Sequence, residues 1–87
     1  SSLNVNGGTL KLNGSTITLA GSATPFSYTT GTINAGTSQI TLNAGLPNAT
    51  VFEGGGATYY NLNQVTGAWR SFTINGSNTF NNLNFSI

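Results

Sequence analysis

The sequence predicts an all-β fold and, within that class, a short parallel β-solenoid with coils of about 21 residues. Three observations support this prediction: apolar and polar residues alternate, Gly and Asn interrupt the chain at short intervals, and two segments repeat. Helix-favouring residues are scarce, and no run is long enough for three helical turns. The 87 residues are expected to form one domain, residues 1–87.

Short strands are expected where one apolar face alternates with one polar face. Six segments have this pattern, at residues 3–5, 10–12, 17–19, 40–42, 72–74 and 83–87. With the less regular segments between them, the chain is expected to hold eight or nine short strands.

Turns are expected between these strands, at residue pairs that accept a left-handed backbone. The pairs are Asn6-Gly7, Asn13-Gly14, Ala20-Gly21, Ala35-Gly36 and Asn75-Gly76. Their spacing is close to seven residues in the first half of the chain, where Leu3, Leu10 and Ile17 open similar segments. Three such segments would make one coil with three sides.

A longer repeat appears in the second half of the chain. Residues 55–63 align with residues 76–84 at a step of 21, which places Val51 on Phe72, Tyr59 on Phe80 and Leu62 on Leu83. Stacked coils place like residues above like residues, so this repeat favours a solenoid with a continuous apolar core. A β-sandwich or jelly roll of eight or nine short strands is the alternative, since residues 22–31, with Pro25, break the period.

Charge is nearly absent from the chain. Lys11, Arg70 and Glu53 are the ionised side chains among 87 residues, and Asn, Thr, Ser and Gly make up more than half of the sequence. Two cations cannot follow a phosphate backbone, so nucleic acid is not an expected partner. No stretch has the length and apolarity of a membrane-spanning helix, so membrane insertion is not expected either. A surface with so little charge favours association with other copies of the chain.

Several segments resemble repetitive β-rich parts of bacterial surface adhesins and of phage fibre or appendage proteins. They are GGTLKLNGSTITLAGS, GTINAGTSQITLNAG, ATYYNLN and NTFNNLNFSI. The resemblance implies an extracellular, cell-surface or virion location and a structural, attachment or host-contact role. It implies no catalytic residues.

Catalysis is not expected from this set of side chains, so the chain is predicted not to be an enzyme. His, Cys and Asp are missing and Glu53 is the only carboxylate, which excludes a paired-carboxylate site or a Ser-His-Asp triad within one chain. No metal site and no cofactor are expected. One covalent alternative stays open: Lys11 could form an isopeptide cross-link with an Asn, with Glu53 relaying the proton.

Two groups of residues are the candidate binding sites. The apolar residues of the terminal strands, Leu83, Phe85, Ile87, Leu3 and Val5, are candidates for assembly with copies of the chain or with other virion or surface proteins. The residues Tyr59, Tyr60, Trp69 and Arg70 are candidates for glycan binding, because sugar rings stack on aromatic faces. The expected function is therefore a structural subunit of an extracellular filament or virion appendage, with a glycan-binding adhesin module as the alternative.

Overall fold

The computed structural model describes residues 2–20, 23–43, 49–65 and 71–86, and within them it is all-β, with eight strands and no helix. The strands are β1 (Leu3–Lys11), β2 (Thr16–Ala20), β3 (Phe26–Asn34), β4 (Gln39–Asn43), β5 (Ala49–Glu53), β6 (Asn61–Val65), β7 (Ser71–Asn75) and β8 (Asn82–Ser86). Odd-numbered strands form one sheet in the order β1-β3-β5-β7, and even-numbered strands form a second sheet in the order β2-β4-β6-β8.

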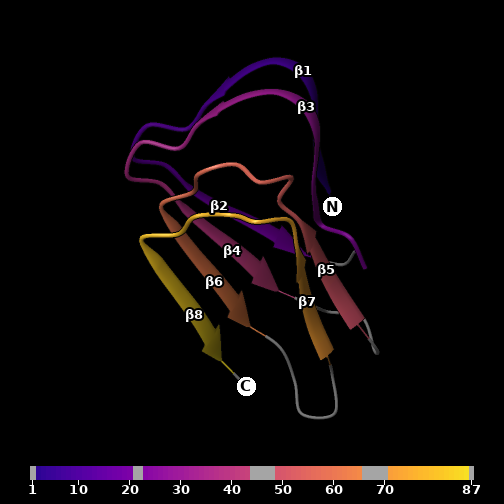
Figure 1. Cartoon of the computed structure of the whole chain (residues 1–87). Helices are drawn as coiled ribbons and strands as arrows, with labels where there is room; N and C mark the ends of the chain where they lie inside the picture. Colours follow the sequence, from indigo (N-terminus) through magenta and orange to yellow (C-terminus); the bar gives the residue numbers. More distant parts are fainter. Residues whose placement is uncertain (1, 21–22, 44–48, 66–70, 87) are drawn as a thin grey trace.

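Every strand pair is parallel, and each strand pairs with the strand two places later in the chain. The chain therefore winds as a β-solenoid of about three turns, as predicted, and the antiparallel sandwich is wrong. We call each odd-numbered strand together with the even-numbered strand that follows it in the chain a coil. The first coil is β1 with β2, the second is β3 with β4, the third is β5 with β6, and the last is β7 with β8. Figure 1 shows the even-numbered strands side by side, with β1 and β3 arching above them.

The coil length changes along the stack. Leu3 pairs with Phe26 at a step of 23 residues, whereas Leu62 pairs with Leu83 at the predicted step of 21. Between β5 and β7 the step is 22, so Phe72 pairs with Thr50 and the predicted alignment of Val51 with Phe72 is wrong by one residue. The cause is a change in the length of the connections between strands, which the strand pattern does not record.

In the first coil one long strand, β1, replaces the two short strands predicted at residues 3–5 and 10–12. At the predicted Asn6-Gly7 turn the chain bends, with φ values of 103° at Gly7 and 72° at Gly8 and a shift in register, but β1 continues through the bend instead of ending there. Residues 22–31 break the 21-residue period, as predicted, since the step from Leu3 to Phe26 is 23 residues, but Phe26 still starts β3 in register with Leu3 and the coil continues. The bend in β3 requires Gly31, whose φ is 114° and whose Cβ, if present, would lie 2.7 Å from the Gly8 carbonyl oxygen.

Beyond these bends, the second halves of β1 and β3 form a third side of the coil. In the last two coils this side narrows to a single bridge between Thr58 and Thr79. The three-sided coil inferred from the seven-residue spacing is therefore present, although its third side is short in the second half of the chain.

Apolar residues line up in columns inside the solenoid, because parallel pairing in register stacks equivalent positions. Two columns come from the even-numbered sheet: Ile17, Ile40, Leu62 and Leu83 form one, and Leu19, Leu42, Gln64 and Phe85 form the other. A third column, from the odd-numbered sheet, contains Leu3, Phe26, Phe52 and Ile74. The buried core lies between these columns.

Candidate functional site

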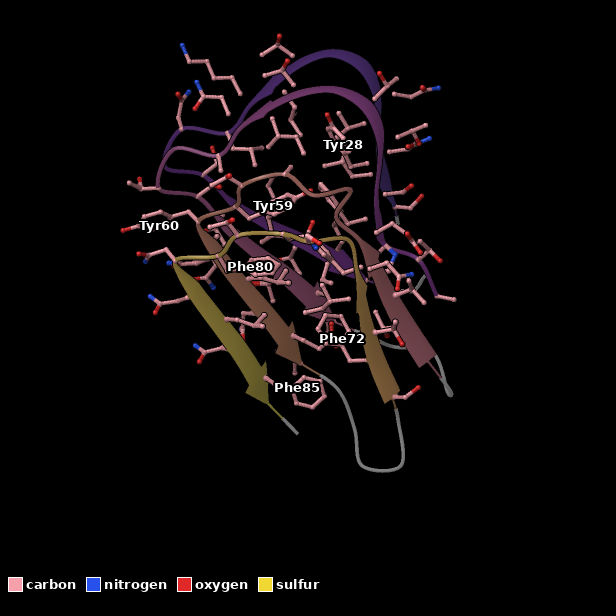
Figure 2. The ribbon with its side chains drawn as sticks, viewed as in Figure 1. Tyr28, Tyr59, Tyr60, Phe72, Phe80 and Phe85 are labelled. Atoms are coloured by element: carbon pink, nitrogen blue, oxygen red, sulfur yellow. The ribbon has the colours of Figure 1, made fainter. Side chains whose placement is uncertain are left out.

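The last coil, β7 with β8, exposes apolar side chains whose equivalents in the second and third coils are buried. Leu83 and Phe85 are each 49% exposed, whereas Leu62 and Leu42 in the same two columns are buried. Phe72 lies across from Phe85, and the two rings are tilted with their centroids 5.7 Å apart. Figure 2 shows these two rings together at the end of the stack, between β7 and β8.

The outer edges of β7 and β8 add backbone groups to this surface. Among the described residues β7 pairs only with β5, and β8 pairs only with β6. An edge strand of this kind presents a row of N–H and C=O groups that can pair with another strand. The last coil thus combines exposed apolar side chains with two strand edges, and we call this combination the open end.

An aromatic cluster supports the open end from inside. Phe26 and Phe52 stack with centroids 4.8 Å apart, and Tyr59 stacks on Phe80 with centroids 5.6 Å apart. The phenol of Tyr59 donates a hydrogen bond of 2.7 Å to the Gly54 carbonyl oxygen. Burial, with a smaller contribution from Tyr28, raises the pKa of Tyr59 well above its usual value, so the phenol is neutral at ordinary pH.

A buried polar side chain, Gln64, lies next to the last coil. The Gln64 side chain is fully buried between Leu42 and Phe85, and its Oε1 has no hydrogen-bond partner among the described residues. Its Nε2 donates to the Val65 carbonyl oxygen at 3.4 Å, a long hydrogen bond. The core beside the last coil therefore contains a buried amide that is only partly satisfied.

The residues predicted for assembly lie at both ends of the stack. Leu83 and Phe85 are exposed in the last coil, whereas Val5 is buried and Leu3 is half-buried in the first coil. Ile87 lies outside the described residues. Sequence reasoning did not include Phe72 as part of this group, although its place in an alternating strand ahead of the last repeat was a usable signal.

The residues predicted for glycan binding have three different outcomes. Tyr59 is 2% exposed and belongs to the core, so its ring faces are not accessible to a sugar. Tyr60 is half-buried, points away from the core at the corner before β6, and lines a cleft between the second and third coils. Trp69 and Arg70 lie outside the described residues.

The two residues of the predicted cross-link are not brought together. Lys11 is exposed at the end of β1, where it pairs in register with Asn34. Glu53 lies at the end of β5, in register with Ser27, and its Oε1 accepts a 2.6 Å hydrogen bond from Asn75 Nδ2. An isopeptide cross-link needs a buried Lys beside the carboxylate, and this arrangement does not supply one.

The described part of the chain contains neither a metal-ligand cluster nor a membrane-spanning helix. It has no group of three or more His, Cys, Asp or Glu side chains that could hold a metal ion. It also has no helix with the length and apolarity needed to cross a bilayer.

Comparisons with known proteins give no relative from which a role could be transferred. No protein-family model, curated protein or solved structure matches the chain.

Proposed function

We propose that this chain is a structural module that self-associates head to tail, with the open end of one copy pairing with the first coil of the next. The observation that carries the proposal is the half-exposure of Leu83 and Phe85 in a coil with two free strand edges. Burying one such side chain stabilises an interface by about 1 kcal/mol, since about half of a full side-chain burial is gained.

The interior columns supply the register for this association. The column of Leu3, Phe26, Phe52 and Ile74 begins with an apolar residue in the first coil and ends with one in the last. A second copy placed after β7 and β8 would set its Leu3 on Ile74 and its Ile17 on Leu83. Each column would then continue through the junction with apolar residues on both sides.

The direction of the strands determines the kind of assembly. All strands are parallel, and the outer edges of β7 and β8 continue the sheets in the same parallel sense when they pair with the edges of β1 and β2 of the next copy. The contact joins two different surfaces and is heterologous, which produces open filaments unless the rotation closes a ring. With Lys11 and Arg70 as the only cations and Glu53 as the only carboxylate, repulsion between copies is small.

The proposed setting is an extracellular filament, a cell surface or a virion appendage, and the proposed role is not enzymatic. The setting is supported by the resemblance to repetitive adhesin and phage-fibre segments. The role is supported by the lack of His, Cys and Asp side chains and by Glu53 being the sole carboxylate.

Sedimentation velocity over a dilution series tests the proposal. The wild-type chain is expected to gain mass with concentration, and the double variant Leu83→Asn, Phe85→Asn is expected to remain monomeric. Both side chains are half-exposed, so the fold of the variant should survive, and circular dichroism checks this. Asn84→Ser is the matched control, because Asn84 lies on the same strand and alternates to the outer face.

Two outcomes contradict the proposal. One is a wild-type chain that stays monomeric across the whole series. The other is a folded double variant that associates as strongly as the wild type, which would place the contact elsewhere on the molecule.

A further inference from the structure

A cleft of about 410 Å³ interrupts the side of the solenoid between the second and third coils. It is lined by residues 32–36, at the end of β3 and in the following turn, and by residues 58–60. Among the residues that the structure describes, β3 and β5 pair through Phe26 with Phe52 and Ser27 with Glu53, and the rest of β3 has no strand partner on this side. The cleft arises because the long arch of the second coil is followed by a shorter third coil.

The backbone of β3 presents hydrogen-bonding groups to this cleft. Leu12 N–H donates to the Asn34 carbonyl oxygen, so Asn34 bonds toward the first coil. In a parallel ladder, alternate residues of a strand bond to opposite sides. The N–H and C=O of Ile33 therefore point toward the third coil, where no described residue pairs with them.

The side chains of the lining are neutral, polar and aromatic. Tyr60 belongs to the lining, and Figure 2 shows its side chain pointing outward from the corner before β6. Thr32, Thr58 and Asn34 are exposed and supply two hydroxyls and one amide. No acidic or basic side chain lines the cleft. The lining thus combines an aromatic ring with several groups that can both donate and accept hydrogen bonds.

We propose that this cleft binds a neutral saccharide, with one sugar ring stacked on Tyr60 and its hydroxyls bonded to the backbone of Ile33 and to Thr58. A sugar ring has an apolar C–H face and a rim of hydroxyls that donate and accept, which matches the two parts of the lining. The volume lies within the range of small-ligand sites, roughly 300–1,000 Å³. The proposal does not depend on self-association, because the cleft lies on the side of the stack.

An extended peptide fits this cleft less well than a sugar does. Strand addition requires a row of unpaired N–H and C=O groups at every second residue of an edge. Within residues 32–36, Asn34 bonds toward the first coil and the Ala35 carbonyl oxygen accepts from Ser38 N–H. Ile33 alone offers both backbone groups, which is too short an edge for a peptide strand.

Titration of a ¹⁵N-labelled chain with neutral disaccharides tests the proposal by NMR, using maltose, cellobiose, lactose and N,N′-diacetylchitobiose at millimolar concentrations. At least one disaccharide is expected to shift the amides of Ile33, Thr58 and Tyr60 saturably. Tyr60→Ala is expected to weaken that binding about tenfold, since it removes the stacking surface. Tyr60→Phe keeps the ring and is expected to weaken binding less.

A second pair of variants separates the loss of a hydroxyl in the cleft from a general effect of replacing Thr by Ala. Thr58→Ala removes one lining hydroxyl and is expected to reduce affinity, whereas Thr18→Ala makes the same change on the exposed face of β2 and is expected to leave affinity unchanged. The proposal is overturned if no disaccharide in the panel shifts these amides saturably. It is equally overturned if a folded Tyr60→Ala chain binds as the wild type does.

Discussion

The first and last coils of the solenoid have the same strand topology but bury their apolar residues to different extents. In the first coil Val5, Leu12 and Leu19 are 5%, 4% and 7% exposed, although this coil has a neighbour on one side only. In the last coil Leu83 and Phe85 are each 49% exposed under the same condition. An end position in a stack therefore does not by itself expose a core residue.

The difference follows from how the two ends are filled. In the first coil, β1 pairs with β3 along nearly its whole length, and Leu12 fills the corner before β2. In the last coil, the residue before β8 is the exposed Asn81, and among the described residues the ring contact between β7 and β8 is the tilted pair of Phe72 with Phe85. The first coil is covered largely by its own aliphatic side chains, whereas Leu83 and Phe85 of the last coil stay half-exposed.

The largest expected effect is a contrast between the same substitution at the two ends. Leu19→Ala should lower the free energy of unfolding by about 2–5 kcal/mol, because it leaves a cavity at a buried site. Leu83→Ala should lower it by about 1 kcal/mol or less, because half of that side chain is already in solvent. Urea denaturation at a concentration where the chain is monomeric measures both values.

Protein concentration sharpens this contrast. If a second copy covers the open end, the cost of Leu83→Ala should grow as concentration rises, while the cost of Leu19→Ala should change less, because that side chain is already buried in the monomer. Equal costs for the two variants in the monomer would show that the last coil is as closed as the first.

The strands and their repeat could be predicted from the sequence, whereas the lengths of the connections could not. Alternation identified the strands, and the 21-residue repeat placed Leu62 beneath Leu83, because both depend on local pattern. Connection lengths are not visible in that pattern, so the alignment of Val51 with Phe72 failed by one residue.

The candidate sites were predicted less completely than the strands. Alternation implies that one of Tyr59 and Tyr60 points inward, yet only packing decides that Tyr59 does. The cleft beside Tyr60 depends on where β3 loses its partner, which involves residues more than twenty positions apart. The burial of Gln64 was equally hidden, since a polar residue gives no apolar signal.

An intermediate effect is expected from Tyr59, which packs on Phe80 of the last coil. Its pKa is raised in the folded chain, so above pH 10, the usual value for tyrosine, the unfolded chain loses this proton first. Stability from this group is therefore complete below pH 10 and falls above it, by up to about 1.4 kcal/mol per pH unit. Denaturation of wild type and Tyr59→Phe between pH 8 and pH 11 measures the slope.

Tyr59→Phe is expected to flatten the fall in stability above pH 10 while losing the hydrogen bond to Gly54, which costs about 1 kcal/mol at all pH values. Tyr60→Phe is the matched control, because it makes the same change at the neighbouring residue outside the core. An unchanged slope in Tyr59→Phe would mean that the phenol is not shielded by the aromatic cluster.

The smallest effect is expected from Gln64, the one polar member of the column that runs from Leu19 to Phe85. Gln64→Leu should raise the free energy of unfolding by about 1 kcal/mol, because it removes a buried amide whose Oε1 is unsatisfied among the described residues. Gln39→Leu is the matched control on the outer face of β4 and should change stability by less than about 0.5 kcal/mol. A loss of stability in Gln64→Leu would show that this amide has a partner in the folded chain. A gain would show that the third coil, like the first coil with its buried Leu19, is more stable with an apolar residue at this position of the column.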